Sequence, residues 1–292
     1  MSFPVFEKYL AILSQSPQVG TSIWLDARGR AQGKYFNCTL TSAYQPIYKL
    51  STRRVIGYEA YARSSSKENA GPSLWKLLDH AANDDESVEL DRLCRMLHAI
   101  NFFRQPEAGE SDLYLSVHDR LLTAVSTNHG MAFRRILEGL GLPIGKIVLQ
   151  LPPVKEHQGW LLNHVADNYR RNGFRLAVNV SNAAEALNLL QRVRPDVIKI
   201  DARKVSLQDH DALAALKLLD DAQSLGIQVI FKRIEGAKAL DGLQHFSKIS
   251  GKEMCVQGHL LGLPNTSLRE LDLSCLSAEA RAAPDWATGC LG

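Results

Sequence analysis

The chain has 292 residues, of which 45% are hydrophobic and 22% are charged, and these values exclude a disordered, collagen-like or fibrous protein. Its 34 basic and 31 acidic side chains leave a net charge of +3, too small to predict binding along a nucleic-acid polymer or a membrane surface. The five cysteines are scattered and lack CxxC spacing, which argues against a disulfide framework and a structural zinc site. No run approaches the roughly 18 apolar residues of a membrane span and no signal-peptide pattern is present, so we expect a soluble, cytoplasmic protein.

Residues 1–40 are expected to form an N-terminal extension. They contain one amphipathic helical stretch, followed by the pattern of a β-hairpin in SIWLDARGRAQGKYF (22–36). The turn of this hairpin contains Gly29 between two arginines, and glycine accepts a positive φ at no steric cost. The sequence therefore predicts a hairpin ahead of the main domain.

Between residues 41 and 265, strand-like apolar runs alternate with helical patterns, which is typical of βα units and a mostly parallel sheet. Strands are predicted over residues 42–48, 55–62, 113–117, 146–151, 174–180, 196–200, 227–231 and 253–257, and helices over 73–82, 88–103, 161–171, 183–193 and 212–226. Only a few residues, KLSTRR, separate the first two strands. Because a crossover helix does not fit there, these two strands should pair antiparallel.

About eight strands with intervening helices in roughly 225 residues predict an α/β fold, a (β/α)8 barrel with an antiparallel first strand. A doubly wound open sheet is the alternative, because strand order cannot be deduced from the pattern. We assign the barrel to residues 41–265. Residues 266–292 are rich in Ala and Ser and contain Pro284, and they form a C-terminal helix or tail in this prediction.

Polar side chains occupy the predicted strand ends, where barrels of this kind place their chemistry. These residues are Glu59, Arg63, His118, Gln150, Asn179, Lys199, Asp201, Lys232 and Gln257. Hard divalent cations require several carboxylates, whereas this set holds only Glu59 and Asp201, and Lys232 would repel a metal. The set therefore favours an anion such as a phosphodiester over a metal. The alternative is a group of solvated polar caps with a Lys199–Asp201 ion pair.

Several motifs together resemble EAL domains, the phosphodiesterase family that acts on cyclic di-GMP. They are YQPI (44–47), GYEAYAR (57–63), VELDR (88–92), LYLSV (113–117), PDVIKID (195–201), GIQVI (226–230) and VQGHLLGLP (256–264). The resemblance covers about 225 residues in the order of the family. It implies a (β/α)8 barrel with an antiparallel first strand, in agreement with the strand pattern.

The departures from the family pattern fall on positions where the resemblance implies metal ligands. This chain has His118, Gln150, Asn179, Val180 and Lys232 at those positions. We expect His118 to be a neutral, hydrogen-bonded histidine, although imidazole can also ligate a transition metal. With these ligands replaced, we expect no metal, no cofactor and no catalysis, so that the chain is a degenerate EAL domain and not an enzyme.

The resemblance also implies which residues bind cyclic di-GMP. Arg63 faces a phosphate, and Asp91 accepts hydrogen bonds from a guanine edge or pairs with Arg92 or Arg95 on its own helix. Tyr61 stacks on a guanine or blocks the pocket. Lys232 meets a phosphate or pairs with Glu59 or Asp201. The full predicted set is Gln45, Pro46, Glu59, Tyr61, Arg63, Asp91, Lys199, Asp201, Lys232, Gln257 and Gly258.

The expected function is therefore a metal-independent receptor for cyclic di-GMP that acts through a partner protein or as a homodimer. The first alternative is a protein-interaction regulator on the same scaffold that binds no nucleotide. The second is a residual phosphodiesterase, which requires Glu59, His118 and Asp201 to recruit a metal despite Lys232.

Overall fold

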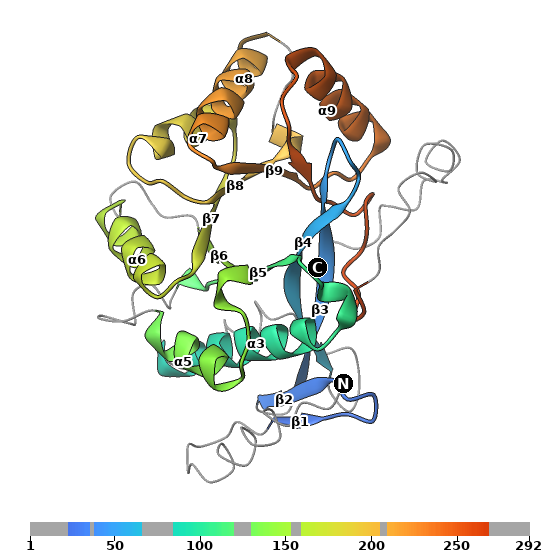
Figure 1. Cartoon of the computed structure of the whole chain (residues 1–292), viewed down its shortest axis with the longest axis vertical. Coiled ribbons are helices and arrows are strands. Elements are labelled where there is room, and N and C mark those ends of the chain that lie inside the picture. The colour runs from blue at the N-terminus through green and yellow to red at the C-terminus, as the bar shows by residue number, and fades with distance from the viewer. Residues whose placement is uncertain are drawn as a thin grey trace.

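The structure is a computed structural model that describes residues 23–35, 38–65, 84–119, 130–152, 159–204 and 209–268. The helices predicted near the N-terminus and over residues 73–82, and most of the predicted C-terminal tail, lie outside these residues. A ring of strands surrounded by helices forms the body of the protein (Figure 1).

The described strands form one sheet in the order β1-β2-β3-β10-β9-β8-β7-β6-β5-β4, and β3 also pairs with β4. They are β1 Ile23–Leu25, β2 Ala31–Tyr35, β3 Cys38–Lys49, β4 Val55–Ser65, β5 Asp112–Ser116, β6 Ile147–Leu151, β7 Arg175–Val180, β8 Val197–Asp201, β9 Gln228–Lys232 and β10 Cys255–Val256. Strand β3 is antiparallel to both β4 and β10, and the other barrel neighbours are parallel. The predicted barrel with an antiparallel first strand is confirmed. The alternative of an open sheet is wrong, because the β3–β4 pairing closes it.

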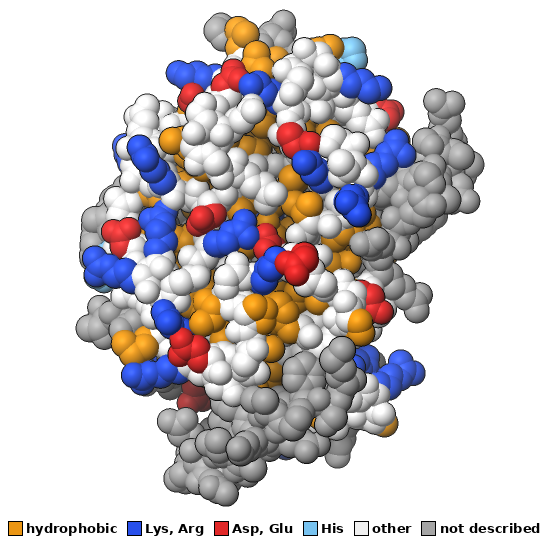
Figure 2. Space-filling view, viewed as in Figure 1, with side chains coloured by type: hydrophobic (Ala, Val, Ile, Leu, Met, Phe, Trp, Pro, Cys, Tyr) orange, Lys and Arg blue, Asp and Glu red, His pale blue; other side chains and the backbone are white. Residues whose placement is uncertain are grey.

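Helices follow most of the parallel strands and lie outside the ring (Figure 1). They are α3 Asp84–Phe103, α5 Met131–Gly139, α6 Gly159–Arg171, α7 Ala183–Leu190, α8 Asp209–Ser224 and α9 Ala237–Ser250, with the 3-10 helices η1 Pro106–Ala108, η2 Ile144–Lys146 and η4 Ala202–Lys204. None of these helices is long and apolar enough to cross a membrane. Basic and acidic side chains are interspersed over the face seen in Figure 2.

The predicted N-terminal hairpin is present as β1 and β2, which pair antiparallel. Gly29 in its turn has a φ of 68°, as the sequence predicts. Strand β2 also pairs with β3, with Gly33 opposite Leu40, so the hairpin extends the barrel sheet. The sheet therefore continues across the boundary placed at residue 40, and the division into 1–40, 41–265 and 266–292 stays a prediction.

The barrel interior consists of an apolar layer beneath a polar layer. The apolar layer is formed by Ile47, Tyr114, Val148, Ala177, Val197, Ile230 and Cys255. Alternate residues of a strand point to the same face, so the next interior position lies two residues nearer the carboxyl ends of the parallel strands. Those positions hold Gln45, Glu59, Ser116, Gln150, Asn179, Lys199, Lys232 and Gln257. The packed apolar layer thus supports a polar layer at the barrel mouth.

A second polar group is buried outside the barrel wall, between β3 and α3. His98 is 5% exposed, and its Nδ1 lies 2.8 Å from Ser42 Oγ. The hydroxyl of Tyr44 donates to the backbone oxygen of His98. Burial lowers the pKa of His98 to about 3, from an ordinary value of 6.5. The folded state therefore holds this imidazole neutral at pH values where the unfolded chain protonates it.

This difference predicts a pH dependence of stability. The contribution of His98 to folding is complete above pH 6.5 and declines as the pH falls toward about 3, because only the unfolded state takes up the proton. The slope attributable to this residue is about 1.4 kcal/mol per pH unit. Urea unfolding between pH 7 and pH 4 should show that His98→Gln removes this slope, whereas the exposed control His245→Gln keeps it. Parallel curves for wild type and His98→Gln would contradict the assignment.

Candidate functional site

The centre of the polar layer is the Glu59 carboxylate on β4, which accepts hydrogen bonds from three strands or strand ends. Lys199 Nζ on β8 lies 2.7 Å from Glu59 Oε2, and Gln257 Nε2 lies 2.6 Å from the same oxygen. Gln150 Nε2 on β6 lies 2.9 Å from Glu59 Oε1. The side-chain oxygen of Gln150, Oε1, accepts a hydrogen bond from Lys199 Nζ at 2.7 Å. These side chains therefore form one closed network.

The network pairs an acidic and a basic side chain in the barrel interior. Burial by itself would raise the pKa of Glu59, but the Lys199 ammonium and the hydrogen bonds from Gln150 and Gln257 lower it to about 2. Burial lowers the pKa of Lys199, and the Glu59 carboxylate acts in the opposite direction. The Lys199 Nζ also lies 5.5 Å above the ring centroid of Tyr114, a cation–π contact from the apolar layer below. Lys199 and Glu59 thus form a buried, neutral pair.

One side of the mouth is connected to the segment that follows β10. Gln45 Nε2 donates to the Gly262 carbonyl at 2.9 Å, and Gln45 Oε1 accepts from Gln257 Nε2 and from the Tyr61 hydroxyl. Arg63 is exposed and donates to the Pro264 carbonyl. The structure therefore brings Gln45, Tyr61 and Gln257 to the Glu59 network, with Arg63 at its rim.

The predicted pairing of Lys232 with Glu59 or Asp201 is wrong. Lys232 Nζ instead donates to Asn179 Oδ1 at 2.6 Å. Glu59 is already paired with Lys199, and Asp201 accepts from Arg203 and Arg233, at 2.9 and 3.0 Å. The alternative with a Lys199–Asp201 ion pair is wrong for the same reason. The pKa of Lys232 is lowered by burial and by the nearby Lys199 charge.

Arg203 and Arg233 are the residues of the mouth that sequence reasoning missed. Arg233 has a φ of 65°, a left-handed conformation that is uncommon for a non-glycine residue. This backbone turn follows β9 directly and points the Arg233 guanidinium back to Asp201. The two arginines lower the pKa of Asp201 to about 2, although burial opposes them. No motif signals this contact, because it depends on a single backbone angle.

Asp91 and His118 are joined by a hydrogen bond. Asp91 Oδ2 is 2.5 Å from Arg95 Nη2, and both side chains are buried. Asp91 Oδ1 accepts from the backbone N–H of His118, whose Nδ1 lies 3.1 Å from Asp119 Oδ1. The predicted contact between Asp91 and a guanine edge stays a prediction, and in this structure the carboxylate faces Arg95.

Three further predicted positions have structural surroundings. Pro46 lies within β3 opposite Tyr58, and Val180 is a buried residue at the end of β7. A side chain at Gly258 would place its Cβ 2.2 Å from the backbone oxygen of Ile234, so only glycine fits there. The close approach at Gly258 fixes the loop after β9 against the segment directly after β10, which carries Gln257.

The resemblance implies divalent cations at this mouth, and the described side chains do not fit them. Within the described ranges, no group of three or more His, Cys, Asp or Glu side chains could hold a metal ion. Both Glu59 oxygens already accept from protein donors. Lys199 and Lys232 add positive charge where a cation would lie. The arrangement provides N–H donors and positive charge, which suit an anion.

Comparison with known proteins supports the fold. The EAL domain family model matches residues 29–247, and a search of curated proteins found no match. A standalone versatile EAL protein from Vibrio cholerae in its c-di-GMP-bound form is 20% identical with a TM-score of 0.63, covering 82% of this chain and 97% of that one. Bacillus subtilis YkuI, with c-di-GMP and calcium, is 20% identical with a TM-score of 0.65, covering 83% and 60%. Klebsiella pneumoniae BlrP1 with FMN and cyclic diGMP but no metal ions is 19% identical with a TM-score of 0.59, covering 85% and 56%.

These matches overturn the expectation that the chain is not an enzyme. That expectation rested on the residues at the predicted metal positions, but the family match spans all of those positions. Cyclic di-GMP is described as the substrate of the Bacillus protein. The replacements by themselves therefore do not establish inactivity. The family model matches residues 29–247, well over half of this chain, and the chain therefore belongs to the EAL domain family.

Proposed function

We propose that this EAL domain binds cyclic di-GMP at its barrel mouth and that binding requires no divalent cation. The observation that carries the proposal is the Glu59 network, in which protein donors already occupy both oxygens of that carboxylate. Similar proteins from Vibrio cholerae and Bacillus subtilis hold c-di-GMP, and the Klebsiella pneumoniae protein holds it without metal ions.

The charges of the mouth support an anionic ligand. Glu59 is neutralised by Lys199, and Asp201 by two arginines. Within the described part of the chain, Arg63 and Lys232 have no carboxylate partner, and their polar contacts are with Pro264 and Asn179. The two phosphodiester groups of cyclic di-GMP carry one negative charge each. Two cations without counter-charges therefore match the charge of the ligand.

Tyr61 on β4 supplies an apolar surface at the mouth. Its side chain is 36% exposed, and its hydroxyl is held by Gln45. An accessible ring fixed at one end suits stacking with a guanine base, which contributes about 1–3 kcal/mol per base. The predicted alternative, in which Tyr61 blocks the pocket, requires the ring to be buried in the mouth, and its exposure favours stacking.

Isothermal titration with cyclic di-GMP, in EDTA and again in Mg²⁺, tests the proposal, and the recovered nucleotide should be analysed for hydrolysis. We expect saturable heat at one site in both buffers. Heat only with Mg²⁺ would contradict metal independence. No heat in either buffer would contradict nucleotide binding and favour the alternative of a protein-interaction regulator that binds no nucleotide.

We propose further that the ligand-bound protein acts through a partner protein or as a homodimer. Light scattering with and without cyclic di-GMP tests whether the ligand changes the oligomeric state.

Replacing Arg63 by glutamine should weaken cyclic di-GMP binding by about 1.5–3 kcal/mol, the usual effect of losing a hydrogen bond to a charged group. The matched control is Arg54→Gln, which removes an exposed arginine from the β3–β4 turn at the other end of the barrel. Equal affinities of the two variants in the same titration would show that the phosphate contact has been placed wrongly.

A further inference from the structure

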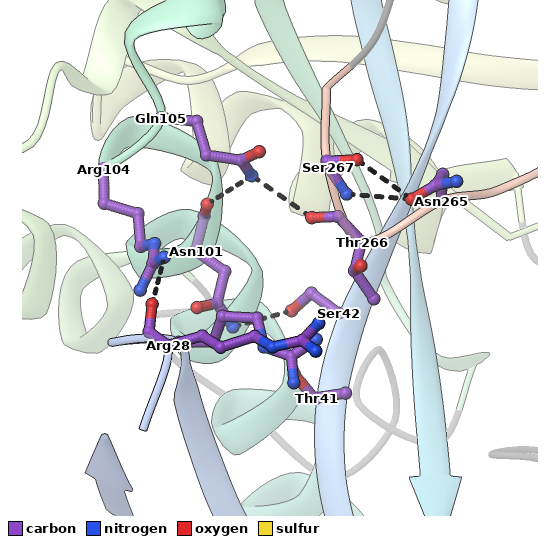
Figure 3. A pocket seen from close by; sticks show the side chains of 10 residues that line it. Arg28, Thr41, Ser42, Asn101, Arg104, Gln105, Asn265, Thr266 and Ser267 are labelled. Atoms are coloured by element: carbon purple, nitrogen blue, oxygen red, sulfur yellow. Dashed lines mark hydrogen bonds between the residues drawn. The ribbon is translucent and has the colours of Figure 1, made fainter. Parts of the chain in front are cut away.

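A second pocket lies outside the barrel wall, in a region to which neither the resemblance nor the proposed function assigns a role. Its volume is about 440 Å³, within the roughly 300–1,000 Å³ range of small-molecule sites. The turn of the β1–β2 hairpin, the edge of β3, the C-terminal end of α3 and residues 265–267 line it. Figure 3 shows Arg104 and Gln105 on one side and Asn265, Thr266 and Ser267 on the other, with Arg28, Thr41 and Ser42 at the bottom of the view.

The charge of this pocket is strongly positive. Arg28, Arg30 and Arg104 line it, and the one described carboxylate paired with any of them is Asp26, which binds Arg30 at 2.7 Å. Arg104 donates to the backbone oxygen of Arg28 and forms no ion pair with a described residue. Arg28 is exposed and likewise has no described ion-pair partner. Three guanidinium groups and one carboxylate leave two positive charges around one cavity.

The arginines are held in place by a preorganised turn. Asp26 Oδ1 accepts from the backbone N–H groups of Arg28 and Arg30, at 2.9 and 2.8 Å. The backbone N–H of Gly29 donates to the Asp26 carbonyl, and its positive φ completes the turn. Such local side-chain to backbone bonds define an Asx turn. The predicted Arg-Gly-Arg turn thus presents its basic side chains from a fixed backbone.

Buried polar groups form the floor of the pocket and connect the hairpin to α3. Asn101 is 4% exposed and bonds both backbone groups of Ala31, accepting from its N–H at 2.7 Å and donating to its carbonyl at 2.8 Å. Asn101 also donates to Ser42 Oγ, and His98 Nδ1 is hydrogen-bonded to the same oxygen. These bonds fix Arg28 on the hairpin relative to Arg104, which directly follows α3. The pocket therefore has a built frame, in contrast to a group of mobile surface arginines.

We propose that this pocket binds a small ligand through a phosphate group, as a free phosphate or a phosphomonoester. Guanidinium groups bind phosphate with bidentate, charge-assisted hydrogen bonds. Approach from two separate elements suits a tetrahedral anion, which accepts from several directions. A phosphomonoester carries about −1.5 to −2 charge near neutral pH, which matches the two positive charges. The hydroxyl and amide groups of Thr41, Thr266 and Asn265 provide partners for a polar remainder of the ligand.

The pocket is separate from the barrel mouth but shares one segment with it. Gln45 and Arg63 contact Gly262 and Pro264 from the mouth. On the other side, the following residues 265–267 line the pocket, and Gln105 donates to the Thr266 carbonyl. Variants at the two sites can therefore be distinguished, because none of the residues lining the pocket belongs to the side chains described above for the mouth.

The test is titration of the full chain with inorganic phosphate, with guanosine 5′-monophosphate and with guanosine, at constant ionic strength. Wild type and the matched control Arg192→Gln, an exposed arginine after α7, should bind both phosphate compounds and not guanosine. Arg28→Gln and Arg104→Gln should each weaken binding by at least about tenfold. Tighter binding of the monophosphate than of phosphate would identify a phosphomonoester, and equal binding would identify free phosphate.

Three results would overturn the proposal. One is unchanged phosphate affinity in Arg28→Gln. The Arg28 side chain makes no described hydrogen bond or ion pair, so this variant is expected to fold normally. Another is loss of phosphate binding in Arg63→Gln, which would place the site at the barrel mouth. The third is the absence of phosphate binding to wild type up to millimolar concentrations. None of these results bears on cyclic di-GMP binding, which is measured separately.

Discussion

Replacing Lys199 by methionine is expected to lower the free energy of unfolding at pH 7 by about 3–5 kcal/mol, because removing one partner of a buried ion pair leaves the other charge uncompensated. Lys199 is completely buried and lies 2.7 Å from the Glu59 carboxylate. The matched control is Lys217→Met, which removes an exposed lysine from the middle of α8. Urea unfolding of the two variants compares the loss of a buried partner with the loss of a surface charge.

The pH dependence of the same variant provides a sharper readout. In wild type the pKa of Glu59 is lowered to about 2 from 4.5, so its contribution is complete above pH 4.5 and is lost as the pH falls toward 2. Without Lys199, burial raises the pKa of Glu59. The folded state then binds the proton more tightly than the unfolded state, and stability declines as the pH rises above 4.5. The double variant Glu59→Gln, Lys199→Met should remove this reversed slope.

A Lys199→Met protein as stable as Lys217→Met, with the wild-type pH profile, would contradict the pairing of Lys199 with Glu59. It would also weaken the proposal of metal-independent binding, because that proposal depends on protein donors holding the Glu59 carboxylate. The stability measurement therefore examines the binding site without requiring a ligand.

The sequence predicts the fold well because periodicity and strand-end chemistry are local properties. The apolar run of β6 and the Lys199–Asp201 alternation of β8 determine which side chains enter the barrel. Strand order was not predictable in this way. The closure of the sheet depends on the β3–β4 pairing, and the short connection between these strands was the one local signal for it.

The partners within the site could not be predicted, because several donors reach the same carboxylates. Strand register alone would allow Glu59 and Asp201 each to pair with either Lys199 or Lys232. The choice is decided by Arg233, whose left-handed backbone turns it toward Asp201, and by Gln150, which holds Lys199 beside Glu59. Residues 181–187 (SNAAEAL), which follow β7, show the same limit. Asn182 caps α7 by accepting from the N–H of Glu185, a local role visible in the sequence only when the helix start is known.

Replacing Asp91 by alanine is expected to destabilise the domain by about 3–5 kcal/mol, because Arg95 would stay buried without its counter-charge. The Arg95 side chain is 2% exposed, and its guanidinium lies 4.9 Å above the ring centroid of Phe133. It therefore has little access to water when the carboxylate is removed. The control is Glu89→Ala, which removes an exposed carboxylate from the same helix. Replacing both partners, as Asp91→Leu with Arg95→Met, should recover much of the loss.

The same variant separates the two roles predicted for Asp91. If the carboxylate stabilises the fold, Asp91→Ala unfolds at lower urea concentration, while the double variant binds cyclic di-GMP with wild-type affinity. If the carboxylate instead accepts from a guanine edge, Asp91→Ala keeps its stability and loses about 1.5–3 kcal/mol of binding free energy. The buried contact with Arg95 favours the first outcome, since a guanine could reach Asp91 only after that ion pair opens.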